Sequence, residues 1–113
     1  MDFSQDLVRG SIVPIVLALL KEKPMYGYEM VKIVNARTNG RFEWREGTLY
    51  PALHKLEADR MVTSKWELVP GEKGDGRSRK YYYITNKGLQ ELTRRADEWK
   101  EFSFAVNACM LGT

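Results

Sequence analysis

The residues with the clearest capacity for chemistry are cations rather than catalytic groups. Arg77, Arg79 and Lys80 place three positive charges within four positions, directly after the glycine-rich stretch 70–76. Exposed cations on an adaptable loop suit contacts with the phosphates of a nucleic acid. A solvated hairpin tip is the alternative interpretation of such a charge run, so the elements around it must decide between the two.

A second set of polar side chains lies on a predicted helix, residues 48–60. Hydroxyl, imidazole and ammonium groups on its outer face are donors for phosphates or base edges, whereas an ordinary polar helix face is the alternative. Glu57 and Asp59, which phosphates would repel, restrict the predicted contact to the first half of the helix. The candidate DNA-contacting residues of this helix are Thr48, Tyr50, Pro51, His54 and Lys55.

Catalytic chemistry has little support in this sequence. The chain has one histidine, His54, and one cysteine, Cys109, with no glycine-rich phosphate loop and no clustered carboxylates. These residues provide no nucleophile–base pair and no zinc-ligand set within one chain. We therefore expect no enzyme activity, no metal and no cofactor, and we interpret Cys109 as a small apolar side chain.

The composition is that of a globular protein of one compact unit. The chain has 113 residues, 43% of them hydrophobic, and 18 Lys and Arg against 15 Asp and Glu, so its net charge is +3. This excess is too small to indicate a nucleic-acid partner by itself, yet it equals the charge of the cluster at 77–80. The apolar run 12–20 is too short to cross a bilayer, and the acidic N-terminus is unlike a signal peptide. We expect a cytoplasmic protein with no membrane contact.

The first half of the chain is predicted to be helical. A buried helix extends over about 6–22, and Pro14 leaves two alternatives: a start at Ser11 with Pro14 in the first turn, or a start near Asp6 with a kink. Residues 23–27 predict a turn, and apolar spacing predicts a helix over about 27–37, ended at Asn39–Gly40. The alternating residues 41–45 predict a short strand or an extended linker.

The third helix, about 48–60, has an apolar stripe at Leu49, Leu53 and Leu56. Thr48 is its predicted N-cap, which would place Pro51 in the first turn. A hairpin follows, with strands over 63–69 and 79–84 and a polar tip at 70–76. The aromatic residues of the linker and hairpin are predicted to pack in the core: Trp44, Trp66, Tyr81, Tyr82 and Tyr83.

The last helix is predicted over about 85–110, roughly 35 Å at 1.5 Å per residue. Apolar and small residues alternate at spacings of three and four, which is typical of a seam between two helices. The predicted dimer-interface residues are Leu89, Leu92, Ala96, Trp99, Ser103, Val106 and Met110. Trp99, between small neighbours, either fills the dimer core or borders a gap that suits a flat aromatic molecule, with Phe102 beside it.

Three helices, a hairpin and a long helix form the order of a winged helix-turn-helix, a mainly α fold with a small β-hairpin. We expect a DNA-binding domain at 1–84, with its recognition helix at about 48–60 and its wing at about 63–84. A dimerisation helix is expected at 85–113.

Three separated motifs resemble the PadR family of bacterial transcriptional regulators. They are Pro24-Met25-Tyr26-Gly27-Tyr28-Glu29, the segment Glu46-Gly47-Thr48-Leu49-Tyr50-Pro51-Ala52-Leu53-His54-Lys55-Leu56-Glu57, and Gly76-Arg77-Ser78-Arg79-Lys80-Tyr81-Tyr82 followed by Ile84-Thr85-Asn86-Lys87-Gly88. The single C-terminal helix is similar to the smaller subfamily that includes the LmrR-like multidrug-binding repressors. The resemblance implies a homodimer held by the last and first helices and DNA binding through the third helix and wing. It also implies release by a small effector, with Trp99 at the stacking position.

The leading hypothesis is thus a dimeric repressor that binds a palindromic operator in double-stranded DNA and is controlled by a planar aromatic effector. The alternative is a winged-helix module that docks on another protein without ligand control. The cations of the predicted wing favour the first hypothesis.

Overall fold

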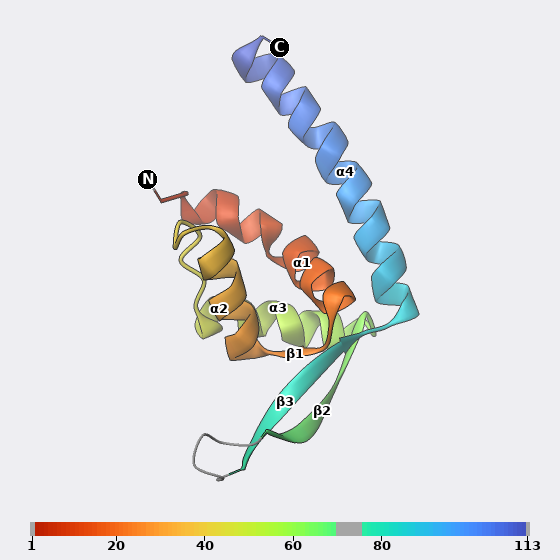
Figure 1. Cartoon of the computed structure of the whole chain (residues 1–113). Coiled ribbons are helices and arrows are strands. Elements are labelled where there is room, and N and C mark those ends of the chain that lie inside the picture. The colour runs from red at the N-terminus through yellow and green to blue at the C-terminus, as the bar shows by residue number, and fades with distance from the viewer. Residues whose placement is uncertain (1, 70–75, 113) are drawn as a thin grey trace.

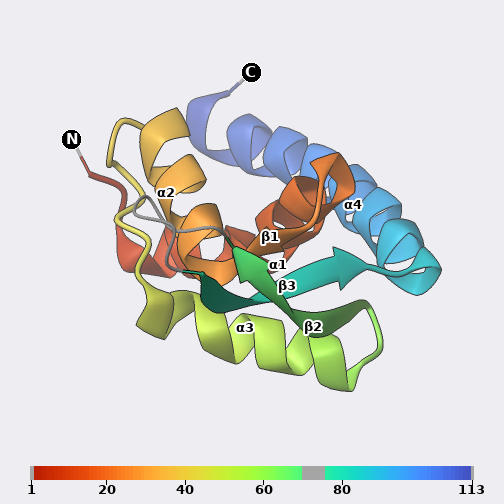
Figure 2. The same ribbon diagram turned by 60° about the horizontal axis from the view of Figure 1, so that its bottom comes forward.

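The computed structural model describes residues 2–69 and 76–112. Within these residues, four helices and a three-stranded antiparallel sheet confirm the predicted mainly α fold with a small hairpin. The elements are α1 (Gln5–Glu22), β1 (Met25–Tyr26), α2 (Gly27–Arg37), α3 (Glu46–Ala58), β2 (Val62–Val69), β3 (Arg77–Ile84) and α4 (Asn86–Leu111). The first three helices form the body, from which the β2–β3 hairpin and the end of α4 project (Figure 1). Figure 2 shows the same chain with the hairpin end turned toward the viewer.

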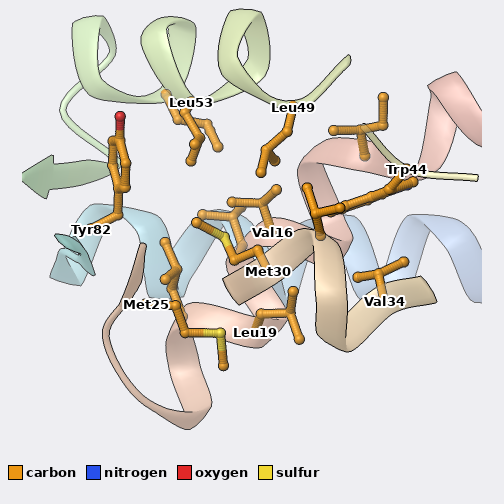
Figure 3. Close-up of a cluster of buried hydrophobic side chains, with 14 of the residues drawn as sticks. Val16, Leu19, Met25, Met30, Val34, Trp44, Leu49, Leu53 and Tyr82 are labelled. Atoms are coloured by element: carbon orange, nitrogen blue, oxygen red, sulfur yellow. The ribbon is translucent and has the colours of Figure 1, made fainter. Parts of the chain in front are cut away.

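One core lies between the three N-terminal helices and the base of the sheet. Figure 3 shows Leu49 and Leu53 of α3 facing Val16 of α1 and Met30 of α2, with Tyr82 of β3 closing one side. Burying such apolar surface is the main stabilising contribution for a domain of this size. The core therefore holds α3 by its apolar stripe and leaves the opposite side of that helix open.

Pro14 lies inside α1, which begins at Gln5, so the structure favours the predicted start near Asp6 over a start at Ser11. A proline has no N–H to donate to the carbonyl four residues earlier, which is that of Gly10. One turn earlier, the Ser11 hydroxyl donates a hydrogen bond to the Val8 carbonyl at 2.7 Å. The helix tolerates the proline because Ile12, Val16 and Leu20 are buried around it.

The predicted bounds of α2 agree with the structure, and the connection that follows is a linker rather than a strand. Asn39 and Gly40 adopt positive φ angles of 53° and 75°, which end the helix. The Asn35 amide then binds both backbone groups of Trp44: it accepts from the N–H at 2.8 Å and donates to the carbonyl at 2.9 Å. This pair of hydrogen bonds fixes the entry to α3.

α3 begins two residues earlier than predicted, which corrects the assignment of Thr48 as its N-cap. Arg45 occupies the N-cap position, with extended backbone and no side-chain capping bond, so Thr48 is the third helical residue. Pro51 consequently lies inside the helix rather than in its first turn. Burial of Leu49 and Leu53 outweighs these local preferences.

The sheet contains a strand that the sequence analysis missed. β1, predicted as a turn, pairs antiparallel with β3, so that Met25 lies opposite Tyr82 and Tyr26 opposite Tyr81. β3 is the central strand and pairs with β2 along eight residues on its other side. β3 also begins at Arg77, two residues before the prediction, and residues 70–75 of the predicted tip lie outside the described residues.

The predicted core role of Trp66 is wrong. Trp44 is 3% exposed and buried, but Trp66 on β2 is 69% exposed. The hairpin extends beyond the helices, so core packing reaches only its base, where Tyr82 is buried. The two-residue periodicity of a strand predicts on which face a side chain lies. It does not predict whether that face packs against the core.

α4 starts at a well-formed cap. The Thr85 hydroxyl accepts a hydrogen bond from the Gly88 N–H at 3.0 Å and lies 2.8 Å from the Arg60 carbonyl. From there the helix extends to Leu111 and contributes to the 57 Å length of the molecule. None of the described helices has the length and apolar character needed to cross a membrane.

Candidate nucleic-acid interface

The outward side of α3 is exposed and carries two polar side chains. Pro51, His54 and Lys55 are exposed on the side opposite the buried leucines, together with Gly47 and Ala58. Gly47, Pro51 and Ala58 have short side chains or none, and none of them carries a side-chain donor. The helix surface between His54 and Lys55 therefore does not protrude. A low surface permits close approach to a groove, and the two polar side chains supply donors within it.

Thr48 and Tyr50, also predicted to contact DNA, lie on the two flanks of α3 and are half-buried. Thr48 faces a groove of about 480 Å³ between α3 and α1, which Arg9 and Lys55 also line. The Tyr50 hydroxyl lies beside Gly27, where an added Cβ would come within 2.8 Å of its oxygen. A side chain at this position would require the Tyr50 ring to shift.

The environment of Tyr50 includes charged groups of both α3 and the hairpin. Burial raises the pKa of Tyr50, Glu46 raises it further, and Arg79 opposes both. The Arg79 guanidinium lies 5.1 Å from the ring centroid of Tyr26, on the same side of β3 as Tyr81. Arg79 thus occupies a position between the hairpin and the start of α2, with aromatic rings beneath it.

Lys80 points to the other face of β3 and toward α3. Its ammonium lies 3.8 Å from the Glu57 carboxylate and 5.8 Å from the Tyr82 ring centroid. The Ser64 hydroxyl of β2 donates a hydrogen bond to the same carboxylate. Glu57 therefore joins both hairpin strands to α3, while Arg77 is exposed farther along the hairpin.

The predicted DNA-contacting residues lie on two neighbouring elements, with Arg77 and Arg79 on one face of β3 and Lys80 on the other. His54, Lys55 and Pro51 occupy the helix, and the cations of β3 occupy the hairpin beside it. Sequence reasoning missed the junction at Glu57, which it had considered only as a source of repulsion. It also missed Arg9, whose spacing on α1 gives no signal of its proximity to Thr48.

The predicted seam of α4 is largely open in the single chain. Trp99, Phe102 and Met110 are 51%, 59% and 75% exposed, and the end of the helix projects away from the body (Figure 1). Leu92 is half-buried against the core, Ser103 and Val106 are half-buried, and Leu89 and Ala96 are exposed. An apolar stripe this exposed is typical of an interaction surface.

Two grooves meet at Trp99. One, of about 400 Å³, is lined by Trp99, Ala96 and Leu92 of α4 together with Pro14 and Ala18 of α1. The other, of about 360 Å³, continues past Trp99 to Phe102, Arg95 and Glu98. The rings of Trp99 and Phe102 lie 6.2 Å apart at a tilt of 40°.

No metal site accompanies these surfaces in the described ranges, where no group of three or more His, Cys, Asp or Glu side chains is arranged to hold an ion. Cys109 is an exposed free thiol near the end of α4.

Comparison with known proteins points to one family. The model of the transcriptional regulator PadR-like family matches residues 16–94. A protein of Lysinibacillus sphaericus is 36% identical over 107 residues, which cover 95% of this chain and 94% of that protein. The transcriptional regulator Rv3488 of Mycobacterium tuberculosis is 48% identical over 54 residues, 46% of each chain.

Solved structures agree with the sequence matches. A transcriptional regulator from Clostridium thermocellum superposes with a TM-score of 0.82 at 30% identity, covering 96% of this chain and 98% of that one. A PadR-like transcriptional regulator from Bacillus cereus superposes with a TM-score of 0.76 at 28% identity, covering 96% and 99%.

Proposed function

This chain belongs to the PadR-like family of transcriptional regulators, and from that premise we propose that it is a dimeric repressor that binds a palindromic DNA operator and is released by a small aromatic molecule. Residues 1–84 form the DNA-binding unit in this proposal, and 85–113 form the dimerisation helix. The contact residues are Thr48, Tyr50, Pro51, His54, Lys55, Arg77, Arg79 and Lys80.

The observation that carries the DNA-binding part is the junction of α3 with the hairpin. The Lys80–Glu57 ion pair and the Ser64 hydrogen bond hold the cationic strand against the recognition helix. A helix of this width enters the major groove, and a hairpin beside it reaches the adjacent phosphates. His54 and Lys55 then face base edges or backbone, and Arg77 and Arg79 face phosphates.

The test is titration of the protein with duplex DNA from the region upstream of its own gene at several salt concentrations. Each lost phosphate contact lowers the slope of log affinity against log salt by about 0.9. Arg77→Ala with Arg79→Ala should weaken binding and reduce this slope by about two such steps. Absence of binding at low salt, or an affinity independent of salt, would contradict the proposal.

Dimerisation is supported by the open stripe of α4. The proposed interface comprises Leu89, Leu92, Ala96, Trp99, Ser103, Val106 and Met110. Two copies that pair these helices bury apolar surface that one copy leaves in water. A two-fold axis between them also places two recognition helices for half-sites about one DNA turn apart.

Effector binding is proposed at the grooves on either side of Trp99, as in the LmrR-like repressors that the sequence resembles. The indole and Phe102 offer flat apolar surfaces for a planar ring, and Glu98 and Arg95 line the same groove with opposite charges. Such a molecule releases DNA only if its affinity differs between two dimer conformations that hold the recognition helices at different spacings.

Tryptophan fluorescence with a panel of planar cationic dyes tests the effector site. Trp99→Ala should abolish most dye binding, and saturating dye should weaken DNA binding by the wild-type protein. If the Trp99→Ala variant binds the dyes as well as wild type does, the stacking role of Trp99 is contradicted. Trp99 would then only pack in the dimer core.

A further inference from the structure

One groove beside α3 has a cation from each of the two helices that border it. The groove has a volume of about 480 Å³ and lies between α1 and α3. Arg9 comes from α1, and Thr48 and Lys55 come from α3. The other lining residues are apolar: Ile12, Val13, Pro51 and Ala52. The groove therefore carries two positive charges and a hydroxyl, and none of the lining residues that the structure describes is acidic.

The groove is continuous with the outward side of α3. Pro51 and Lys55 line the groove and are also exposed on that outward side. Arg9 is open to solvent as well, with 71% of its side chain exposed. A partner that covers the outward side of α3 therefore extends to the edge of the groove, and Arg9 lies on the other side of that groove.

The acidic side chains nearby leave these two cations available. Asp6 forms an ion pair with Arg9 at 3.3 Å, but the Asp6 side chain is 91% exposed. An ion pair between exposed side chains contributes little, so a phosphate can replace this carboxylate. Burial and then Glu46 raise the pKa of Tyr50, so Glu46 acts on the flank of α3 that faces away from the groove. Lys55 forms no ion pair with any residue that the structure describes.

We propose that Arg9 binds a phosphate of the DNA backbone beside the major groove that α3 enters. The two cations select an anionic partner, and the continuity of the groove with the outward side of α3 selects the strand next to the recognition helix. A guanidinium donates two parallel N–H bonds to a phosphate, which suits an arginine at the edge of a groove. This inference rests on the proposed DNA binding and extends the interface from α3 and the hairpin to α1.

The salt dependence of DNA affinity tests this contact. The full chain is titrated into a labelled duplex from upstream of its own gene and into an unrelated duplex of the same length, with fluorescence anisotropy as the readout. Arg9→Ala should weaken binding roughly five- to tenfold at about 0.1 M salt and reduce the slope of log affinity against log salt by about 0.9. The loss should be equal for the two duplexes, because phosphates carry no sequence information.

Two variants on the same helix serve as controls. Lys21→Ala removes the same charge from the last turn of α1, roughly 18 Å away at 1.5 Å per residue, and should keep the wild-type slope. Arg9→Lys keeps the charge and should also keep the slope, with a smaller loss of affinity because an ammonium lacks the paired donors of a guanidinium. Urea denaturation of each variant shows whether the fold is unchanged.

The outcomes distinguish this inference from the proposed function. No binding by wild type at low salt overturns both. Wild-type binding with an unchanged Arg9→Ala variant overturns only the contact at Arg9. A loss confined to one duplex, or a loss with no change of slope, also overturns it, because Arg9 would then read bases or support the fold. An equal loss for Lys21→Ala overturns it as well, since net charge alone would then account for the effect.

Discussion

The carboxylate of Glu57, on α3, lies 3.8 Å from the ammonium of Lys80, on β3. This pair joins α3 to the hairpin, and the Ser64 hydroxyl adds a hydrogen bond from the second strand. It also places a negative charge next to the cations that would meet phosphates. The Glu57–Lys80 pair is therefore expected to make the junction between α3 and the hairpin more rigid. It is also expected to lower the affinity for DNA.

Glu57→Gln should raise affinity for DNA severalfold at low salt, because a repelled carboxylate disappears and Lys80 becomes available for phosphate. The free energy of unfolding should fall by less than about 1 kcal/mol, since the ion pair is partly exposed. Anisotropy and urea denaturation measure the two effects.

Glu67→Gln is the matched control, with the same charge change on the other face of β2, where Glu67 pairs with Lys65. Weaker DNA binding by Glu57→Gln than by this control would show that the junction contributes more through geometry than through charge.

Gly88→Ala should destabilise the fold by more than about 2 kcal/mol, because an overpacked site must shift backbone. A Cβ at Gly88 would lie 2.2 Å from the Met61 carbonyl oxygen, at the first turn of α4. Gly47→Ala is the contrast: it meets nothing within 4 Å and should stabilise α3 by about 0.5 kcal/mol. Equal destabilisation by the two variants in chemical denaturation would contradict this packing argument.

Tyr82→Phe should reduce the loss of stability at alkaline pH. Burial raises the pKa of Tyr82, which is 1% exposed, so the folded state keeps a proton that the unfolded chain releases near pH 10. The stabilisation is complete below that pH and is lost as pH rises above it. Thermal unfolding between about pH 8.5 and 11 should therefore show a flatter decline for Tyr82→Phe than for wild type.

Tyr28→Phe is the control for this measurement, because Tyr28 is an exposed tyrosine on α2. Its alkaline decline should match that of wild type. Identical declines for Tyr28→Phe and Tyr82→Phe would place the alkaline effect in other groups.

Met110→Glu should weaken the proposed dimer at least about tenfold, because a charge on the apolar seam must be desolvated when two helices pair. Gln90→Glu adds the same charge to an exposed position of α4 outside the predicted seam and should leave association unchanged. Sedimentation equilibrium distinguishes the two. Equal association constants for both variants would argue against this seam.

Much of the helical part of the fold was predictable because its signals are local. The apolar spacing of α2 and the stripe of Leu49, Leu53 and Leu56 depend on a period of 3.6 residues and on nothing far along the chain. The cluster of cations on β3 could likewise be identified from the sequence. These patterns, with their order, indicated a winged helix-turn-helix and the family to which the chain belongs.

Tertiary structure decided the features that depend on distant partners. Met25 and Tyr26 form a strand only because β3 provides the hydrogen-bonding edge, and a two-residue strand has no periodicity to detect. Trp44 is buried because Asn35 holds its backbone against the core, whereas Trp66, with the same side chain, lies on a hairpin that extends past every helix. A sequence specifies which side chains prefer burial, and the positions of the other elements determine which of them obtain it.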